Sequence, residues 1–107
     1  MRAFIIAGLL AFAPAVQAED MVTYELNLKG AAFDMLELKV PAGKPFIIKM
    51  NNQNAAPAEL ESHDLDIEKI VAGNSSAVVR VKAQKPGKYL FVDEFQEAVA
   101  KGYIIVE

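Results

Sequence analysis

The sequence predicts an all-β protein folded as an antiparallel β-sandwich, and three observations support this prediction. Beyond residue 20, apolar side chains recur at every second position over most of the chain, a period typical of strands with one buried face. The apolar stretches are short, and segments rich in glycine, proline or asparagine separate them, as in turns. About seven short strands at such spacing are typical of two antiparallel sheets that enclose one core.

The first half of the chain shows this alternation in each expected strand. The strands lie at residues 22–28, 36–40, 46–50 and 59–61. Gly30 marks the turn after the first of them, and residues 41–44 (PAGK) form the turn after the second, because glycine and proline favour turn conformations. A polar loop at residues 51–57 separates the third strand from the fourth.

The second half continues the pattern to the end of the sequence. Strands are expected at residues 65–71, 77–82, 89–92 and 103–106. The segments 73–76 (GNSS) and 85–87 (KPG) have the composition of turns. Only residues 97–101 (EAVAK) favour a helix, of about one turn. No internal repeat or linker divides the chain, which predicts a single domain.

The N-terminus has the features of a secretory signal peptide. Arg2 supplies a positive charge, and the apolar run that follows it is well short of the roughly 20 residues that span a membrane. Val16 and Ala18 place small residues before a cleavage site. We therefore expect residues 1–18 to be removed, residues 19–107 to form the mature domain, and the mature protein to be periplasmic rather than membrane-embedded.

The composition argues against several functions. The chain has 11 basic and 14 acidic residues and a net charge of −3, whereas nucleic-acid binding requires a basic surface. It has no cysteine, so it offers neither a thiolate ligand nor a thiol nucleophile. Ser62, His63 and Asp64 are adjacent in sequence, and adjacent strand residues point in opposite directions, so they do not predict a catalytic triad. We expect a binding protein rather than an enzyme.

Several stretches resemble the cupredoxins. Residues 33–43 (FDMLELKVPAG) and 46–52 (FIIKMNN) are similar to the first half of a cupredoxin, and residues 86–91 (PGKYLF) and 102–106 (GYIIV) are similar to its second half. The resemblance covers nearly all of the mature chain. It implies a cupredoxin-like Greek-key β-sandwich.

The acidic segments resemble one group in particular. Residues 57–62 (PAELES) and 68–71 (EKIV) are similar to the EfeO-type cupredoxin-like proteins, which are periplasmic components of bacterial iron-uptake systems. This resemblance implies an accessory protein that binds a transition-metal ion, iron or copper, for iron uptake. Its implied partners are an inner-membrane iron permease and a second periplasmic metal-binding protein.

The ligands of a blue-copper site are missing from this sequence. Carried over by resemblance, the first histidine of that site falls at Ala58 or Glu59, the cysteine at Asp93, the second histidine at Gln96 and the axial methionine near Ala100. Type-1 copper requires two histidines and a cysteine with a weak axial ligand. We therefore expect no type-1 copper centre.

Acidic residues occupy or adjoin those positions. Glu59 and Glu61 are two residues apart on an expected strand, so their carboxylates share one face. Asp93 and Glu94 follow a later strand, and the resemblance places their loop beside that face. His63, the one histidine of the chain, comes two residues after Glu61. We expect the metal ligands to be Glu59, Glu61, His63, Asp93 and Glu94.

The chemistry of these side chains limits the choice of metal and leaves a second interpretation open. Carboxylates are hard donors that suit Fe³⁺ and Mn²⁺ and also bind Cu²⁺, but have little affinity for Cu⁺. However, residues 59–68 contain five acids, and such a run is commonly a solvated face on which Glu68 and Lys69 form a surface ion pair. On that interpretation, the chain is a metal-free cupredoxin-like β-sandwich that serves as a protein-interaction module.

Overall fold

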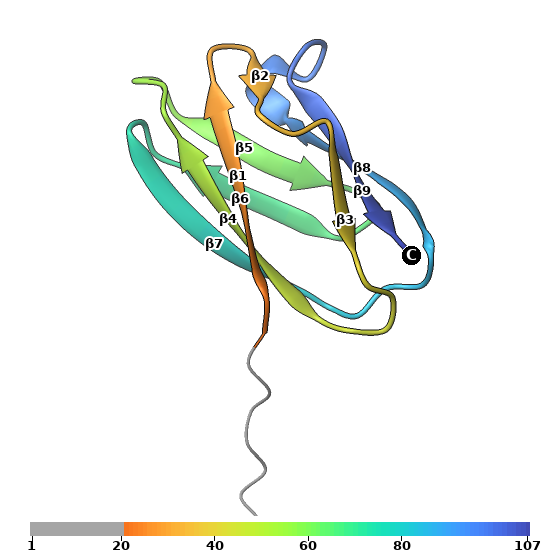
Figure 1. Cartoon of the computed structure of the whole chain (residues 1–107). Helices are drawn as coiled ribbons and strands as arrows, with labels where there is room; N and C mark the ends of the chain where they lie inside the picture. The colour runs from red at the N-terminus through yellow and green to blue at the C-terminus, as the bar shows by residue number, and fades with distance from the viewer. Residues whose placement is uncertain (1–20) are drawn as a thin grey trace, which may run out of the picture.

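The computed structural model describes residues 21–107, which fold as a sandwich of two β-sheets (Figure 1). The strands are β1 (Thr23–Lys29), β2 (Ala32–Phe33), β3 (Glu37–Val40), β4 (Phe46–Asn52), β5 (Ala58–Ser62), β6 (Ile67–Val71), β7 (Ser75–Val81), β8 (Gly87–Asp93) and β9 (Lys101–Val106). A 3₁₀ helix, η1 (Glu94–Gln96), follows β8. The predicted all-β sandwich is confirmed.

The sequence also predicted a cleaved signal peptide and a mature protein that is not embedded in a membrane. The expected signal peptide, residues 1–18, lies outside the described residues. Within residues 21–107, no helix is both long enough and apolar enough to cross a membrane.

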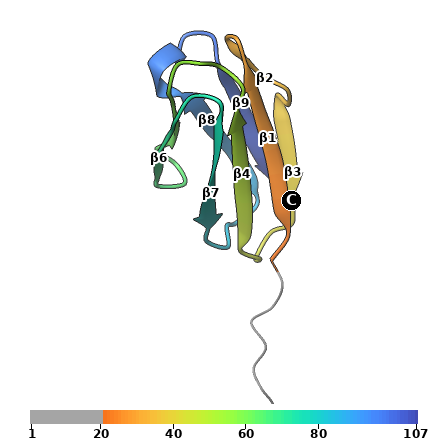
Figure 2. The ribbon, with the colours of Figure 1, turned by 90° about the vertical axis from the view of Figure 1, so that its left-hand side faces the viewer.

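The strands form one sheet in the order β2-β1-β4-β7 and a second in the order β3-β9-β8-β5-β6. In Figure 2, β7, β4 and β1 of the first sheet lie in front of β8 and β9 of the second. Most neighbours pair antiparallel, as predicted, but β1 pairs with β4 and β3 pairs with β9 in parallel. The chain places β3 in the other sheet before it returns in β4, so β1 and β4 run in the same direction.

The core lies between the sheets and follows the alternation of the sequence. In β4, the buried apolar residues are Phe46, Ile48 and Met50, as their spacing predicts. The rings of Phe33 and Phe91 meet edge to face with their centroids 5.0 Å apart, a favourable aromatic geometry. These packed strands form a rigid base for the residues on the outer faces.

The end of the sandwich that holds η1 is closed by polar contacts. The backbone at Gly30, in the β1–β2 turn, exchanges two hydrogen bonds with the side chain of Asn54, at 2.7 and 2.9 Å. The Nε2 atom of Gln96 donates a further hydrogen bond to the Gly30 carbonyl at 3.3 Å. Figures 1 and 2 show η1 and this turn at the same end of the molecule. η1 is therefore held against the sandwich.

Candidate metal centre

Strand β5 presents two glutamates on the outer face of the five-stranded sheet. Ala58 and Leu60 are buried in the core, so Glu59 and Glu61 point to the opposite face, in agreement with their spacing. Glu61 is nevertheless only 8% exposed. Carboxylates from the segment after β8 lie against it, and that segment shields it from solvent.

Strand β6 adds a third glutamate to this face. Glu68 lies directly opposite Glu61 in the antiparallel β5–β6 pair, and like charges in opposite positions destabilise a sheet. The expected ion pair of Glu68 with Lys69 does not form among the described residues, because adjacent strand residues point to opposite faces. Glu68 is thus left facing another acid.

Asp93 begins the turn that follows β8. It is 1% exposed, and its Oδ1 atom accepts hydrogen bonds from the backbone N–H of Glu59 at 3.0 Å and of Phe95 at 3.1 Å. Its Oδ2 atom accepts a hydrogen bond from Nε2 of Gln96 at 3.0 Å. Asp93 therefore caps η1 and joins it to β5.

These contacts give Asp93 a structural role, and its role as a metal ligand stays a prediction. Three donors already engage both of its carboxylate oxygens, and Asp93 belongs to neither group of metal-capable side chains among the described residues. The three hydrogen bonds that this buried carboxylate accepts stabilise the turn, and that turn carries Glu94 toward β5.

Two groups of carboxylates converge around Glu94. Oxygen atoms of Glu59, Glu68 and Glu94 lie within 4.8 Å of one another, and so do oxygen atoms of Glu61, Glu94 and Glu97. An ion with metal–oxygen bonds of about 2.0–2.4 Å can bridge oxygens at such separations. We refer to these five residues as the glutamate cluster.

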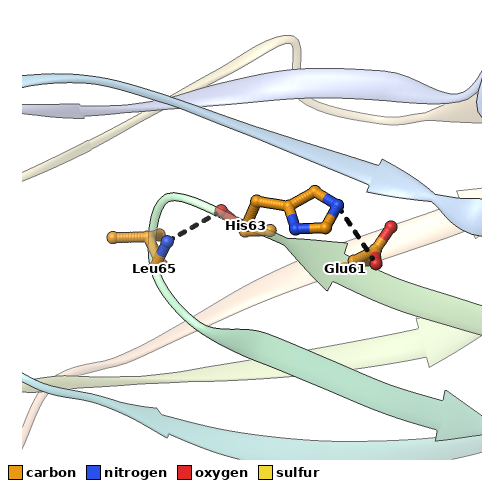
Figure 3. A network of polar contacts seen from close by, with 4 residues as sticks. Glu61, His63 and Leu65 are labelled. Atoms are coloured by element: carbon orange, nitrogen blue, oxygen red, sulfur yellow. Dashed lines mark hydrogen bonds and ion pairs between the residues drawn. The ribbon is translucent and has the colours of Figure 1, made fainter.

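His63 lies at the rim of the glutamate cluster. Figure 3 shows its imidazole directed toward Glu61, and its Nε2 atom is 3.6 Å from Oε2 of Glu61. This distance is longer than a hydrogen bond, and the side chain of His63 is 90% exposed. His63 therefore lies beside Glu61 but belongs to neither carboxylate group.

The electrostatics of the glutamate cluster disfavour full ionisation. A hydrogen bond with Glu94, followed by burial and the charge of Glu94, raises the pKa of Glu61 to about 7. Burial, and then the charges of Glu68 and Glu94, raise the pKa of Glu59. Within residues 21–107, no lysine or arginine forms a salt bridge with the cluster. The nearest basic side chains in this part of the chain are His63, which faces Glu61, and Lys101, which lines the same pocket as Glu61 and Glu97.

A pocket of about 500 Å³ opens beside Glu61. Its polar lining includes Glu61, His63 and Glu97, and Leu90 and Val92 of β8 contribute apolar surface. The pocket gives solvent a route to one side of the glutamate cluster.

Glu68 and Glu97 belong to the glutamate cluster but were not among the ligands predicted from the sequence. Glu68 could have been placed from the short β5–β6 connection, because a tight hairpin fixes which residues lie opposite each other. Glu97 had no such signal. Its position depends on the path of the turn that Asp93 initiates.

The positions that correspond to blue-copper ligands do not fit such a centre. Ala58 and Ala100 are buried and offer no donor side chain. Asp93 and Gln96 are hydrogen-bonded to each other, and Gln96 also donates to Gly30. These positions therefore lack the two histidines and the cysteine that a type-1 copper ion requires.

Solved structures with the same fold come from copper proteins. Auracyanin A, a blue copper protein from Chloroflexus aurantiacus, aligns with a TM-score of 0.71 and 21% identity over 82% of this chain and 100% of its own. The metal-binding domain of a Cu(I)-exporting P-type ATPase from Streptococcus pneumoniae aligns with a TM-score of 0.70 and 15% identity, over 85% of this chain and 91% of that one. At such identities the likeness establishes the fold alone.

Sequence comparison identifies the family. An uncharacterized protein of Rickettsia prowazekii (strain Madrid E) is 31% identical over 88 residues, which cover 82% of this chain and 70% of that protein. The cupredoxin-like domain matches residues 2–106. The chain therefore belongs to the cupredoxin-like domain family.

Proposed function

We propose that this protein binds a transition-metal ion through the glutamate cluster and acts as a periplasmic accessory protein of an iron-uptake system. The observation that carries the proposal is the convergence of Glu61, which is 8% exposed, with Glu94 and Glu97. No lysine or arginine within residues 21–107 forms a salt bridge with these carboxylates. A bound cation would offset the mutual repulsion of these carboxylates.

The donor atoms favour iron over copper. The cluster offers carboxylate oxygens, with one imidazole at its rim, and the chain has no thiolate. Such donors suit ferric iron and also accept Cu²⁺, whereas Cu⁺ prefers sulfur ligands. The copper proteins of similar fold support metal binding in general, and the resemblance of residues 57–62 and 68–71 to EfeO-type proteins supports iron in particular.

The remaining parts of the proposal concern the cellular context. The protein would be exported, would bind metal without catalysing a reaction, and would pass the ion to an inner-membrane iron permease or receive it from a second periplasmic metal-binding protein. The signal-like N-terminus and the resemblance to EfeO-type proteins support this context.

A metal-free interaction module is the second candidate function. Phe95 is 53% exposed and Val99 is 61% exposed in the segment after β8, and Ile70 is 60% exposed on β6. Exposed large apolar side chains are common at protein-binding surfaces. This candidate predicts partner binding that does not depend on metal.

Metal titration of the mature protein separates the two candidates. After removal of metals with a chelator, addition of Fe²⁺ under anaerobic conditions or of Cu²⁺ is expected to raise the unfolding free energy by about 2.7 kcal/mol at a hundredfold excess over Kd. Glu61→Gln should abolish most of this increase. Glu37→Gln, on the exposed edge strand β3 of the same sheet, is the matched control and should keep it. If metal raised the unfolding free energy equally in the wild type, Glu61→Gln and Glu37→Gln, the metal would bind elsewhere in the chain.

Export is tested separately by the mass of the processed chain. Protein recovered from the periplasm is expected to begin at Glu19, because Val16 and Ala18 have the small side chains that signal peptidase requires. Intact-mass spectrometry of the periplasmic fraction measures this. A chain that retains residues 1–18 and sediments with membranes would contradict the proposed localisation.

A further inference from the structure

Two neighbouring strands of the five-stranded sheet, β8 and β9, are apolar on both faces. Phe91 and Ile104 are buried in the core. The outer face of this sheet, turned away from β7, β4 and β1 in Figure 2, carries a second apolar set on the same strands. We call this set the apolar strip, and its members are Leu90, Val92, Tyr103 and Ile105. Strands that are apolar on both faces are typical of positions covered on both sides.

The outer face of the four-stranded sheet does not share this property. On β1 and β4, the outward side chains are polar except for Ile47. Asn51 donates hydrogen bonds to Glu25 at 2.9 Å and to Asn27 at 2.8 Å across these strands. Such an outer face is suited to water. The apolar strip is therefore a feature of one face of the sandwich.

The apolar strip is continuous and accessible. Leu90 lies directly opposite Tyr103 in the β8–β9 pair, a position in which side chains of neighbouring strands touch. Leu90 is 38% exposed. The Nζ atom of Lys88 lies 4.3 Å from the centre of the Tyr103 ring, so a charged group borders the apolar surface.

Opposite charges flank the apolar strip on its two sides. On one side lies the glutamate cluster, with Glu61 directly opposite Val92 in the β5–β8 pair. On the other side, the outward residues of β3, β8 and β9 include one acid, Glu37, and several exposed lysines. These lysines are Lys39, Lys88 and Lys101. The face thus has an acidic side and a basic side.

This arrangement is complementary to itself. A two-fold axis that lies in the plane of the face, between its two sides, exchanges them. It would bring the glutamate cluster of one copy over the lysines of the other and would lay the two apolar strips against each other. Closed two-fold dimers are the commonest oligomers of soluble proteins, and opposite-charge patches fix the orientation in which two surfaces meet. The lysines would also offset the repulsion among the carboxylates.

We infer that the outer face of the five-stranded sheet binds a second copy of this chain in a two-fold symmetric dimer. In this dimer, the glutamate cluster of each copy faces Lys39, Lys88 and Lys101 of the other. The contact is no wider than one small sheet, so the interface lies at the small end of specific complexes, with a Kd in roughly the micromolar range. The inference does not rest on the proposed function, and a bound metal would compete with the lysines for the same carboxylates.

Sedimentation equilibrium of the mature protein tests the inference. The buffer contains a chelator, so that no metal occupies the glutamate cluster, and little salt, because salt screens the charges. The wild type is expected to be a dimer at high concentration. Leu90→Ser, in the apolar strip, should weaken the dimer by about tenfold or more. Arg80→Glu is the control. It reverses an exposed charge on β7, at the edge of the other sheet, and should leave the dimer unchanged.

Charge reversal tests the two-fold symmetry. Glu68→Lys and Lys88→Glu should each weaken the dimer by about tenfold or more, because like charges would then meet on both sides of the axis. Both residues are exposed, so each variant should fold, and its melting curve checks this. An equal mixture of the two variants should dimerise again, since every acidic position of one chain would then face a basic position of the other.

Each remaining outcome would overturn the inference. A wild type that sediments as a monomer up to about 0.5 mM would show that a second copy does not bind this face. A dimer that Leu90→Ser and Lys88→Glu leave intact would place the contact elsewhere on the chain. A mixture of the folded variants Glu68→Lys and Lys88→Glu that stays monomeric would exclude the two-fold pairing. Because the chelator is present throughout, none of these results bears on metal binding.

Discussion

Asp93→Ala is expected to lower the free energy of unfolding by about 2–4 kcal/mol, because it removes the acceptor of three hydrogen bonds at a buried position. The backbone N–H groups of Glu59 and Phe95 and the amide of Gln96 would all lose their partner. Urea denaturation monitored by circular dichroism measures the loss. Asp64→Ala, at an exposed acid in the β5–β6 turn, is the control and should change stability by less than about 0.5 kcal/mol.

Asp93→Asn distinguishes a cap from a metal ligand. The asparagine side chain retains one oxygen that can accept from Glu59 and Phe95, so this variant should be less destabilised than Asp93→Ala. Because Asp93 lies outside both carboxylate groups, Asp93→Asn should also bind metal with the wild-type stoichiometry. If Asp93→Asn lost metal binding while keeping wild-type stability, Asp93 would be a ligand and its assignment as a cap would be wrong.

The stability of the metal-free protein is expected to fall as pH rises from about 4.5 to about 7. The pKa of Glu61 is raised from 4.5 to about 7 in the folded state. In this window the folded chain therefore keeps a proton that the unfolded chain releases, so raising the pH favours unfolding. The stabilisation from this proton is fully present below pH 4.5 and is lost as pH rises through about 7. The raised pKa of Glu59 acts in the same direction.

Glu61→Gln isolates this effect. Glutamine cannot ionise, so the stability of the metal-free variant should fall much less than that of the wild type as pH rises through about 7. At pH 8 without metal, the variant should be the more stable of the two proteins. With metal the trend reverses, because ions compete with protons for the carboxylates and metal-induced stabilisation grows with pH. Melting temperatures between pH 4 and pH 8, with and without Fe²⁺, measure both trends. Identical pH profiles for metal-free wild type and Glu61→Gln would refute the raised pKa as the cause.

The alternation of side chains predicted most of the fold because burial of one strand face is a local property of the sequence. In β4 and β7 the buried and exposed positions follow the predicted period. Strand direction is not encoded in that period, so the parallel β1–β4 and β3–β9 pairs were not predicted. β2 has two residues, too few to show any period.

The site was predictable only where it depends on local geometry. The shared face of Glu59 and Glu61 follows from their spacing, and the structure agrees. The helical turn was expected at residues 97–101, but η1 begins at Glu94 because Asp93 caps it. The capped turn places Glu97 beside Glu61 and Glu94. This placement depends on contacts between β5 and the segment after β8, which no local pattern in the sequence records.

Anomalous X-ray diffraction from crystals of the mature protein grown with Fe²⁺ or Mn²⁺ would show whether the glutamate cluster holds a metal ion. Data collected at the absorption edge of the metal locate bound ions without reference to the protein. We expect anomalous peaks within about 2.0–2.4 Å of carboxylate oxygens in the glutamate cluster, with Glu94 in contact with metal. If this region is well ordered and no peak lies beside Glu61 or Glu94, the glutamate cluster is not a metal site.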